Sequence, residues 1–122
     1  MTRINCIPVG ELTNKHLVAE YRELPRVFNL ARMPHTNEQF PQEYTLGKGH
    51  VKFFYDKLGY CYNRQHQLYN EMKRRGMKPN YNPELLYLEH WFHKIKLWND
   101  WTPTELDQHI NRQRIQERLK ND

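Results

Sequence analysis

Residues 14–32 read NKHLVAEYRELPRVFNLAR, and they decide the fold class because their apolar side chains recur at helical spacing. Steps of four, three, four and three residues separate the members of one apolar stripe: Leu17, Tyr21, Leu24, Phe28 and Ala31. Such a stripe is typical of a helix that packs one side against a core. Thr13 or Asn14 is the expected N-cap. Pro25 lacks a backbone donor and crowds the preceding turn, so we expect it to kink this helix.

The other side of the same stretch is polar. It carries four side chains that lie off the apolar stripe: His16, Glu20, Glu23 and Arg26. We therefore expect this side of the helix to face solvent or a ligand.

The rest of the chain also favours helices. Residues 33–49 are rich in Pro and Gly and are expected to form a loop. A second helix should follow, with an inner side made of Phe54, Leu58, Cys61, Gln65, Leu68 and Met72. The basic run 73–75 suits the negative end of that helix, and Gly76 suits its stop.

Two further helix starts are visible in the last third of the chain. Asn82 and Pro83 suit the start of a third helix, which we expect to continue to about Leu97. Residues 102–105 (TPTE) combine a capping-box pattern with an early Pro and should open a last helix through Leu119. We predict an all-α fold over residues 1–122: a compact single-domain bundle of three to four helices with an extended N-terminal segment threaded between them.

The composition narrows the class of protein. A formal net charge of +5 over 122 residues favours an anionic partner such as nucleic acid. Two cysteines are too few for a disulfide scaffold or a zinc site. No apolar run reaches membrane-spanning length and no signal-peptide core is visible, so no membrane partner is expected. The expected location is the cytoplasm of a bacterium or of a virus-infected host cell, and the expected state is a monomer.

The N-terminus offers a nucleophile. An initiator Met ahead of Thr2 is normally removed, which would leave a free α-amine beside Arg3. The pKa of an α-amine is about 7.7–8.0, so roughly a tenth of it is the free base at neutral pH. Such an amine can attack a carbon centre without being buried.

Taken together, several stretches resemble the pyrimidine-dimer DNA glycosylase family, the dimer-specific endonuclease V type. The resemblance is close over roughly residues 1–32 and 45–76, loose from 77 to 101, and faint through the last helix. The matching stretches are Met1-Thr2-Arg3-Ile4-Asn5, His16-Leu17, residues 19–28 (AEYRELPRVF) and residues 46–58 (LGKGHVKFFYDKL).

The resemblance implies both a reaction and its residues. The Thr2 amine would attack the anomeric carbon of a deoxyribose, expel the base and leave an imine, after which β-elimination cuts the strand. Glu23 would be the catalytic carboxylate that moves protons. The remaining residues would bind DNA, mostly at phosphates: Arg3, His16, Arg22, Arg26, Lys48, His50 and Lys52. No metal or other cofactor is implied, because the imine takes up the electrons.

The implied substrate is a cyclobutane pyrimidine dimer in duplex DNA. The family bends the DNA and holds a base outside the helix. This chain departs from the family in a shorter loop between the first two helices and in the lack of an aromatic C-terminal tail. Trp98 and Trp101 are expected in the core, with base stacking in place of the tail as the alternative. Two other functions stay open: the same chemistry on another modified base, or a non-catalytic basic helical module that binds DNA.

Overall fold

The computed structural model describes residues 3–31 and 41–121, without the side chains of 92–94 and 121. Regular structure in these residues is helical throughout, which confirms the predicted all-α class. The elements are η1 (Val9–Glu11), α1 (Asn14–Glu23), α2 (Arg26–Leu30), α3 (His50–Phe53), α4 (Leu58–Arg74), α5 (Glu84–His90), η3 (Phe92–Leu97) and α6 (Glu105–Asn121). No helix in the described part is long and apolar enough to cross a membrane.

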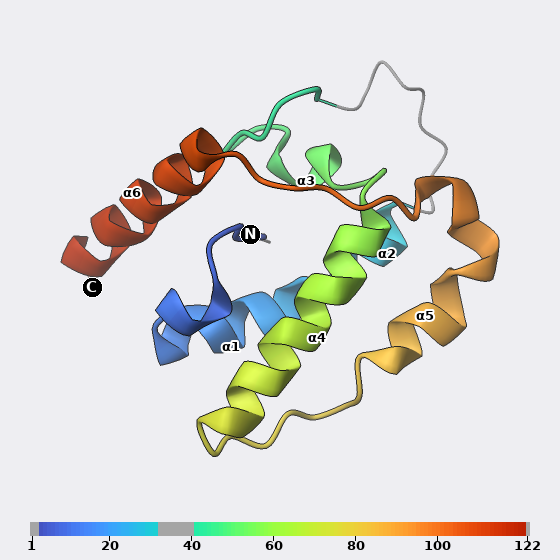
Figure 1. Cartoon of the computed structure of the whole chain (residues 1–122), viewed down its shortest axis with the longest axis horizontal. Helices are drawn as coiled ribbons and strands as arrows, with labels where there is room; N and C mark the ends of the chain where they lie inside the picture. The colour runs from blue at the N-terminus through green and yellow to red at the C-terminus, as the bar shows by residue number, and fades with distance from the viewer. Residues whose placement is uncertain (1–2, 32–40, 122) are drawn as a thin grey trace.

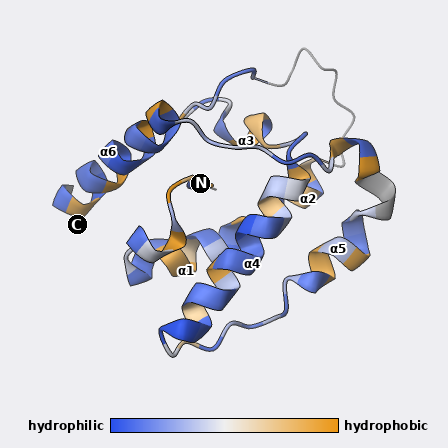
Figure 2. Ribbon diagram, in the orientation of Figure 1, coloured by the Kyte–Doolittle hydropathy of each residue, from blue (hydrophilic) through white to orange (hydrophobic). Residues whose placement is uncertain are grey.

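Helix α4 runs through the middle of the molecule, and α1 packs against it (Figure 1). Helix α5 lies to one side of α4. Helix α6 lies on the opposite side, and the N-terminal segment enters the space between it and α1. The surface of α6 is mostly hydrophilic, with a few apolar residues (Figure 2). The N-terminal segment therefore lies between α1 and α6.

The predicted helix over residues 14–32 is divided into α1 and α2. Thr13 caps α1 by accepting a hydrogen bond from the backbone N–H of His16 at 3.2 Å. The division falls at Leu24 and Pro25, where the missing donor interrupts the helical ladder. The predicted apolar stripe is confirmed, because every one of its members is buried: Leu17, Tyr21, Leu24, Phe28 and Ala31. The final residue of the prediction, Arg32, lies outside the described residues.

The other predicted helices also differ in their bounds. The second is preceded by the short α3, which begins after Gly49, a residue with φ of 86°. The third was predicted to reach Leu97, but α5 ends at His90 and continues as the 3-10 turn η3. The linker after η3 crosses the start of α4, where Tyr60 N donates to Asn99 O at 3.1 Å. A Cβ on Gly59 would lie 3.0 Å from that same oxygen, so glycine permits the crossing.

The extended N-terminal segment is held by side chains from three other elements. The Ile4 N–H donates to His50 of α3, and the Cys6 N–H donates to Asn111 of α6, both at 2.8 Å. Arg64 of α4 donates to the Ile7 carbonyl at 2.6 Å. The backbone groups of this segment have no sheet partner in the described structure, so these side chains supply the hydrogen bonds that they need. The prediction of a threaded N-terminal segment is thus confirmed for residues 3–8.

Beneath this segment lies a buried ion pair that the sequence did not reveal. Arg64 Nε lies 2.8 Å from Glu20 Oε2, with the two side chains 3% and 1% exposed. Asn5 donates to Glu20 Oε1 at 2.8 Å, and Asn111 donates to Asn5 Oδ1 at 2.8 Å. Glu20 was expected on the open polar side of α1. That expectation was wrong, because the N-terminal segment covers this part of the helix.

Candidate active site

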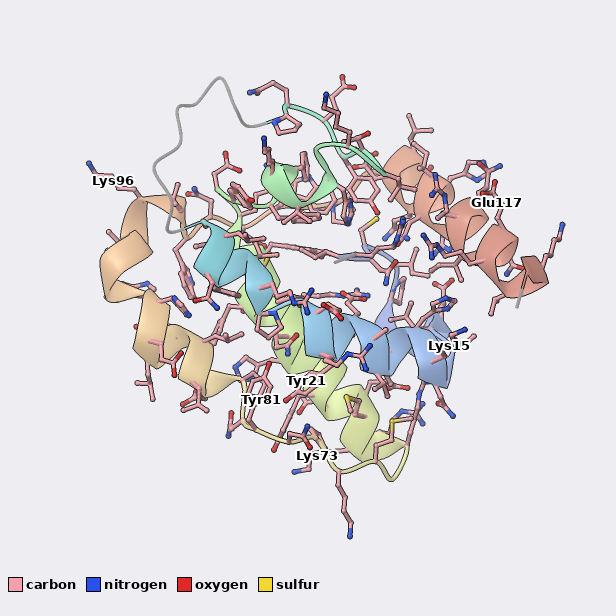
Figure 3. The ribbon with its side chains drawn as sticks, turned by 180° about the vertical axis from the view of Figure 1, so that it is seen from behind. Lys15, Tyr21, Lys73, Tyr81, Lys96 and Glu117 are labelled. Carbon is pink, nitrogen blue, oxygen red and sulfur yellow. The ribbon has the colours of Figure 1, made fainter. Side chains whose placement is uncertain are left out.

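A pocket of about 250 Å³ opens between α1, the N-terminal segment and α6. Arginine, lysine and glutamate supply six of its ten lining residues, which are Arg3, Asn5, Lys15, His16, Ala19, Glu20, Glu23, Arg114, Ile115 and Arg118. Seen from behind, the end of α1 that carries Lys15 lies beside α6, which carries Glu117 (Figure 3). We call this space the α1–α6 pocket. Three residues predicted for the site line it, namely Arg3, His16 and Glu23.

Glu23 occupies the last position of α1, and its side chain is 18% exposed. Arg26 Nη1 approaches Glu23 Oε2 to 2.9 Å, and Arg22 Nε approaches Oε1 to 3.5 Å. Despite the short distance from Arg26, Oε2 is buried and receives no hydrogen bond from the described residues. An ion pair at this distance can still be misaligned for a hydrogen bond. Glu23 Oε2 therefore has an ion-pair partner but keeps its hydrogen-bond acceptor capacity unused within the described residues.

Arg3 is the second group in the pocket with unused hydrogen-bonding capacity. Its Nη1 atom is buried and has no hydrogen-bond partner in the described part of the chain. Burial lowers the pKa of its guanidinium, and the positive charges of Arg118 and Arg114 lower it further. An arginine stays protonated even so. Three cations thus converge at one end of the pocket, an arrangement suited to an anion such as phosphate.

His16 lies at the first turn of α1. Its Nδ1 atom is 3.0 Å from Thr13 Oγ1, so the side chain that caps the helix also orients the imidazole. This contact engages the Nδ1 edge of the ring while the residue lines the pocket. The predicted role of His16 in shaping the site stays a prediction.

The other predicted DNA-binding residues lie away from the pocket lining. Arg22 and Arg26 flank Glu23 with side chains that are 71% and 63% exposed, so both can reach a ligand outside the pocket. Lys48 and Lys52 are exposed near α3. His50 differs from its lysine neighbours, because it is buried and both of its ring nitrogens are engaged within the protein.

Thr2, the predicted nucleophile, lies outside the described residues. Its neighbour in the chain, Arg3, lines the pocket together with Glu23. Several lining residues were not predicted, and the clearest are Arg114 and Arg118 on α6. Their spacing of four residues on one helix was the available signal. Nothing in the sequence alone showed that α6 would face the N-terminal segment.

Comparison with known proteins adds an independent finding. A family model described as pyrimidine dimer DNA glycosylase matches residues 1–85 of the chain. The match covers the N-terminal segment, α1 and α4, and thus Arg3, His16 and Glu23. Helix α6, which completes the pocket with Arg114 and Arg118, lies beyond the matched residues.

Proposed function

The chain belongs to the pyrimidine dimer DNA glycosylase family, and from that premise we propose a glycosylase and abasic-site lyase that acts through the α-amine of Thr2. Membership makes it a DNA repair glycosylase, with damaged DNA as its partner. The proposal adds the nucleophile, the imine and the strand cleavage. It also adds the substrate, a cyclobutane pyrimidine dimer in duplex DNA.

The reaction begins when the neutral Thr2 amine attacks C1′ of the deoxyribose. The bond from C1′ to the base nitrogen breaks, and the base leaves with the electron pair and takes up one amine proton. The sugar ring then opens, O4′ takes the second proton, and a C1′=N imine remains. Glu23 is the group that we propose to carry these protons, because its carboxylate lies in the pocket with an unfilled acceptor atom.

Strand cleavage follows from the same imine. Loss of a proton from C2′ is eased by the imine, which accepts the electron pair. That electron pair then forms the C2′=C3′ double bond as the C3′–O bond breaks, and the 3′ phosphate leaves with the electrons of that bond. Water hydrolyses the imine and returns the Thr2 amine. We propose that Arg3, which lines the pocket together with Arg114 and Arg118, holds a phosphate next to the reacting sugar.

One observation carries the proposal. In a single pocket beside the start of the chain, a buried carboxylate oxygen and a buried guanidinium nitrogen both lack a hydrogen bond within the described residues, although the carboxylate oxygen is ion-paired with Arg26. Buried polar atoms are normally satisfied, so two orphans in one pocket indicate a missing ligand that has both a proton to share and an anionic group. A nucleotide sugar with its flanking phosphate meets both requirements.

The test is borohydride trapping on a duplex with one abasic site, because only an imine can be reduced to a permanent protein–DNA link. A removable N-terminal tag, cut by a protease that leaves Thr2 as the first residue, gives a matched pair of proteins. We expect efficient trapping and strand cleavage after tag removal, and loss of both, by at least about 100-fold, with the tag in place. Full trapping by the tagged protein would move the nucleophile to a lysine.

The same experiment decides the non-catalytic alternative. A helical module that only binds DNA would shift the duplex in a gel in both forms and would be trapped in neither. A second duplex containing a cyclobutane dimer tests the substrate, because dimer excision requires recognition of the lesion as well as the amine. Trapping on the abasic site without dimer excision would assign the chemistry to another lesion.

A further inference from the structure

The part of the chain that carries the proposed nucleophile is first anchored at Ile4. Its backbone N–H donates to His50 Nε2 at 2.8 Å, and His50 Nδ1 lies 2.8 Å from Thr45 O. Because an N–H must donate, Nε2 is the accepting nitrogen, and the ring proton therefore sits on Nδ1 and points at the Thr45 carbonyl. In the neutral ring, Nε2 thus accepts from Ile4 and Nδ1 donates to Thr45.

The ring itself is fixed by its surroundings. His50 is 1% exposed, and its ring lies edge-on to Tyr44 and Phe54 at centroid distances of 5.7 and 5.5 Å. The side chain cannot follow the N-terminal segment if that segment moves. It is a rigid acceptor for the buried Ile4 N–H.

We infer that His50 is a positioning residue for the proposed reaction: by holding the Ile4 backbone, it fixes how far the Thr2 amine can stray from Glu23. The inference rests on the proposed function of the Thr2 amine. It gives His50 a role inside the protein, whereas the sequence suggested a contact to phosphate.

The size of the effect follows from chain geometry. Two residues separate Thr2 N from Ile4 N, so the amine stays within about 7 Å of this anchor. Without the bond to His50, the next anchor is Asn5, whose side chain bonds to Glu20 and Asn111, and the tether grows to about 11 Å. Lengthening the tether from about 7 to about 11 Å enlarges the accessible volume roughly fourfold and dilutes the amine about fourfold at the sugar. The remaining anchors, at Asn5 O, Cys6 N and Ile7 O, stay in place.

Two substitutions distinguish the hydrogen bond between His50 and Ile4 from the one between His50 and Thr45. His50→Asn keeps an amide near the Nδ1 position, where it can still donate to Thr45, but it cannot reach Ile4. His50→Gln places its amide oxygen near the Nε2 position, where it can still accept from Ile4. The measured quantities are the single-turnover rate of imine formation on an abasic duplex and the affinity for a tetrahydrofuran duplex, which cannot form an imine.

We expect His50→Asn to form the imine about fourfold more slowly than the unmodified protein, with affinity changed less than twofold. His50→Gln should recover most of the rate. An unchanged rate in His50→Asn would overturn the inference, and so would equal losses of rate and affinity in both variants. Failure of the unmodified protein to trap at all would instead refute the proposed function.

A backbone change tests the same bond without touching His50. Cys6 permits ligation of a synthetic peptide of residues 2–5 to the rest of the chain. Replacing the amide between Arg3 and Ile4 by an ester removes the Ile4 N–H donor and puts an oxygen in its place, without changing any side chain. This protein should show the same fourfold loss, and adding His50→Asn to it should cost little more, because both changes remove one bond. Additive losses would show that His50 acts through something other than Ile4.

Discussion

At Glu23 and Arg3, single side-chain atoms indicate the candidate site. Both residues have neighbours of opposite or like charge, yet each keeps one buried polar atom without a hydrogen bond in the described structure. The exposed arginines around Glu23 contribute little stability in water, as surface ion pairs generally do. Contact with a ligand therefore explains the position of these arginines better than stabilisation of the fold does.

Replacing Glu23 by Gln should separate catalysis from binding. The change keeps the size of the side chain but removes its ability to accept and release protons. We expect imine formation to fall by at least about 100-fold while affinity for damaged DNA stays within a few-fold. Single-turnover trapping and a binding titration measure the two. A Gln variant that reacts at the normal rate would show that the carboxylate is structural.

The burial of His50 predicts that the folded protein loses stability in acid. Burial lowers the pKa of His50 to about 4, from an ordinary value near 6.5. The unfolded chain therefore binds a proton at higher pH than the folded one does, and stability falls as the pH drops from about 6.5 to about 4. The full effect is about 3 kcal/mol.

Urea unfolding of the native protein and of His50→Gln, at pH 7 and at pH 4.5, measures this difference. The native protein should lose more stability than the variant over that interval. Carboxylates such as Glu71, whose pKa the neighbouring Arg74 and Arg75 lower to about 2, titrate alike in both proteins and cancel. Equal losses would show that His50 titrates normally.

At the scale of elements, periodicity predicted what local sequence controls. The apolar stripe of residues 14–32, its cap and its break at Pro25 all follow from neighbours in the chain. Glu20 could not be predicted in the same way, because its burial depends on Asn5 and Arg64, which approach from other elements. The burial of His50 was not predicted either. The turn before α3, in which Gly47 and Gly49 have positive φ, directs its side chain inward.

The linker between η3 and α6 also belongs to this scale. Trp101 stacks on Tyr44 at 5.7 Å and meets Phe53 and Tyr60 edge-on at 5.2 and 5.0 Å. Trp98 packs against Phe28 at 5.5 Å. Both tryptophans are partly buried against the core, as the sequence favoured over base stacking.

Replacing Trp101 by Leu should therefore weaken the fold by about 2 kcal/mol, because an aromatic side chain is lost from a packed cluster. Thermal unfolding followed by circular dichroism measures the change. Abasic-site cutting and dimer excision should fall together. If dimer excision alone were lost, with an unchanged melting temperature, Trp101 would have the stacking role instead.

At the scale of the whole molecule, the pocket is assembled from both halves of the chain. Arg3 comes from the N-terminal segment and Arg114 and Arg118 come from α6, beyond the family match. Sequence reasoning found the first and missed the other two. Because the apolar side of α6 is weakly defined, the sequence did not show which element this helix packs against.

Removing both α6 arginines tests whether they contact phosphates. Arg114→Ala with Arg118→Ala should weaken DNA binding and reduce the slope of log K against log salt by about 2, since each contact contributes about 0.9. Arg112→Ala is the matched control, because Arg112 lies on the same helix but pairs with Glu11 outside the pocket. A slope that changed equally in the control would indicate a general effect of charge.

The bond from Cys6 to Asn111 spans 105 residues, and this has a consequence for the order in which the protein is made. The N-terminal segment is synthesised first, yet it cannot complete its contacts until α6 has left the ribosome. Contacts of such separation form late, because the intervening chain must first be ordered. A nascent chain that has passed residue 85 therefore already contains Arg3 and Glu23 but has no α6 to complete the pocket that they line. The α1–α6 pocket is thus complete only after the last helix folds.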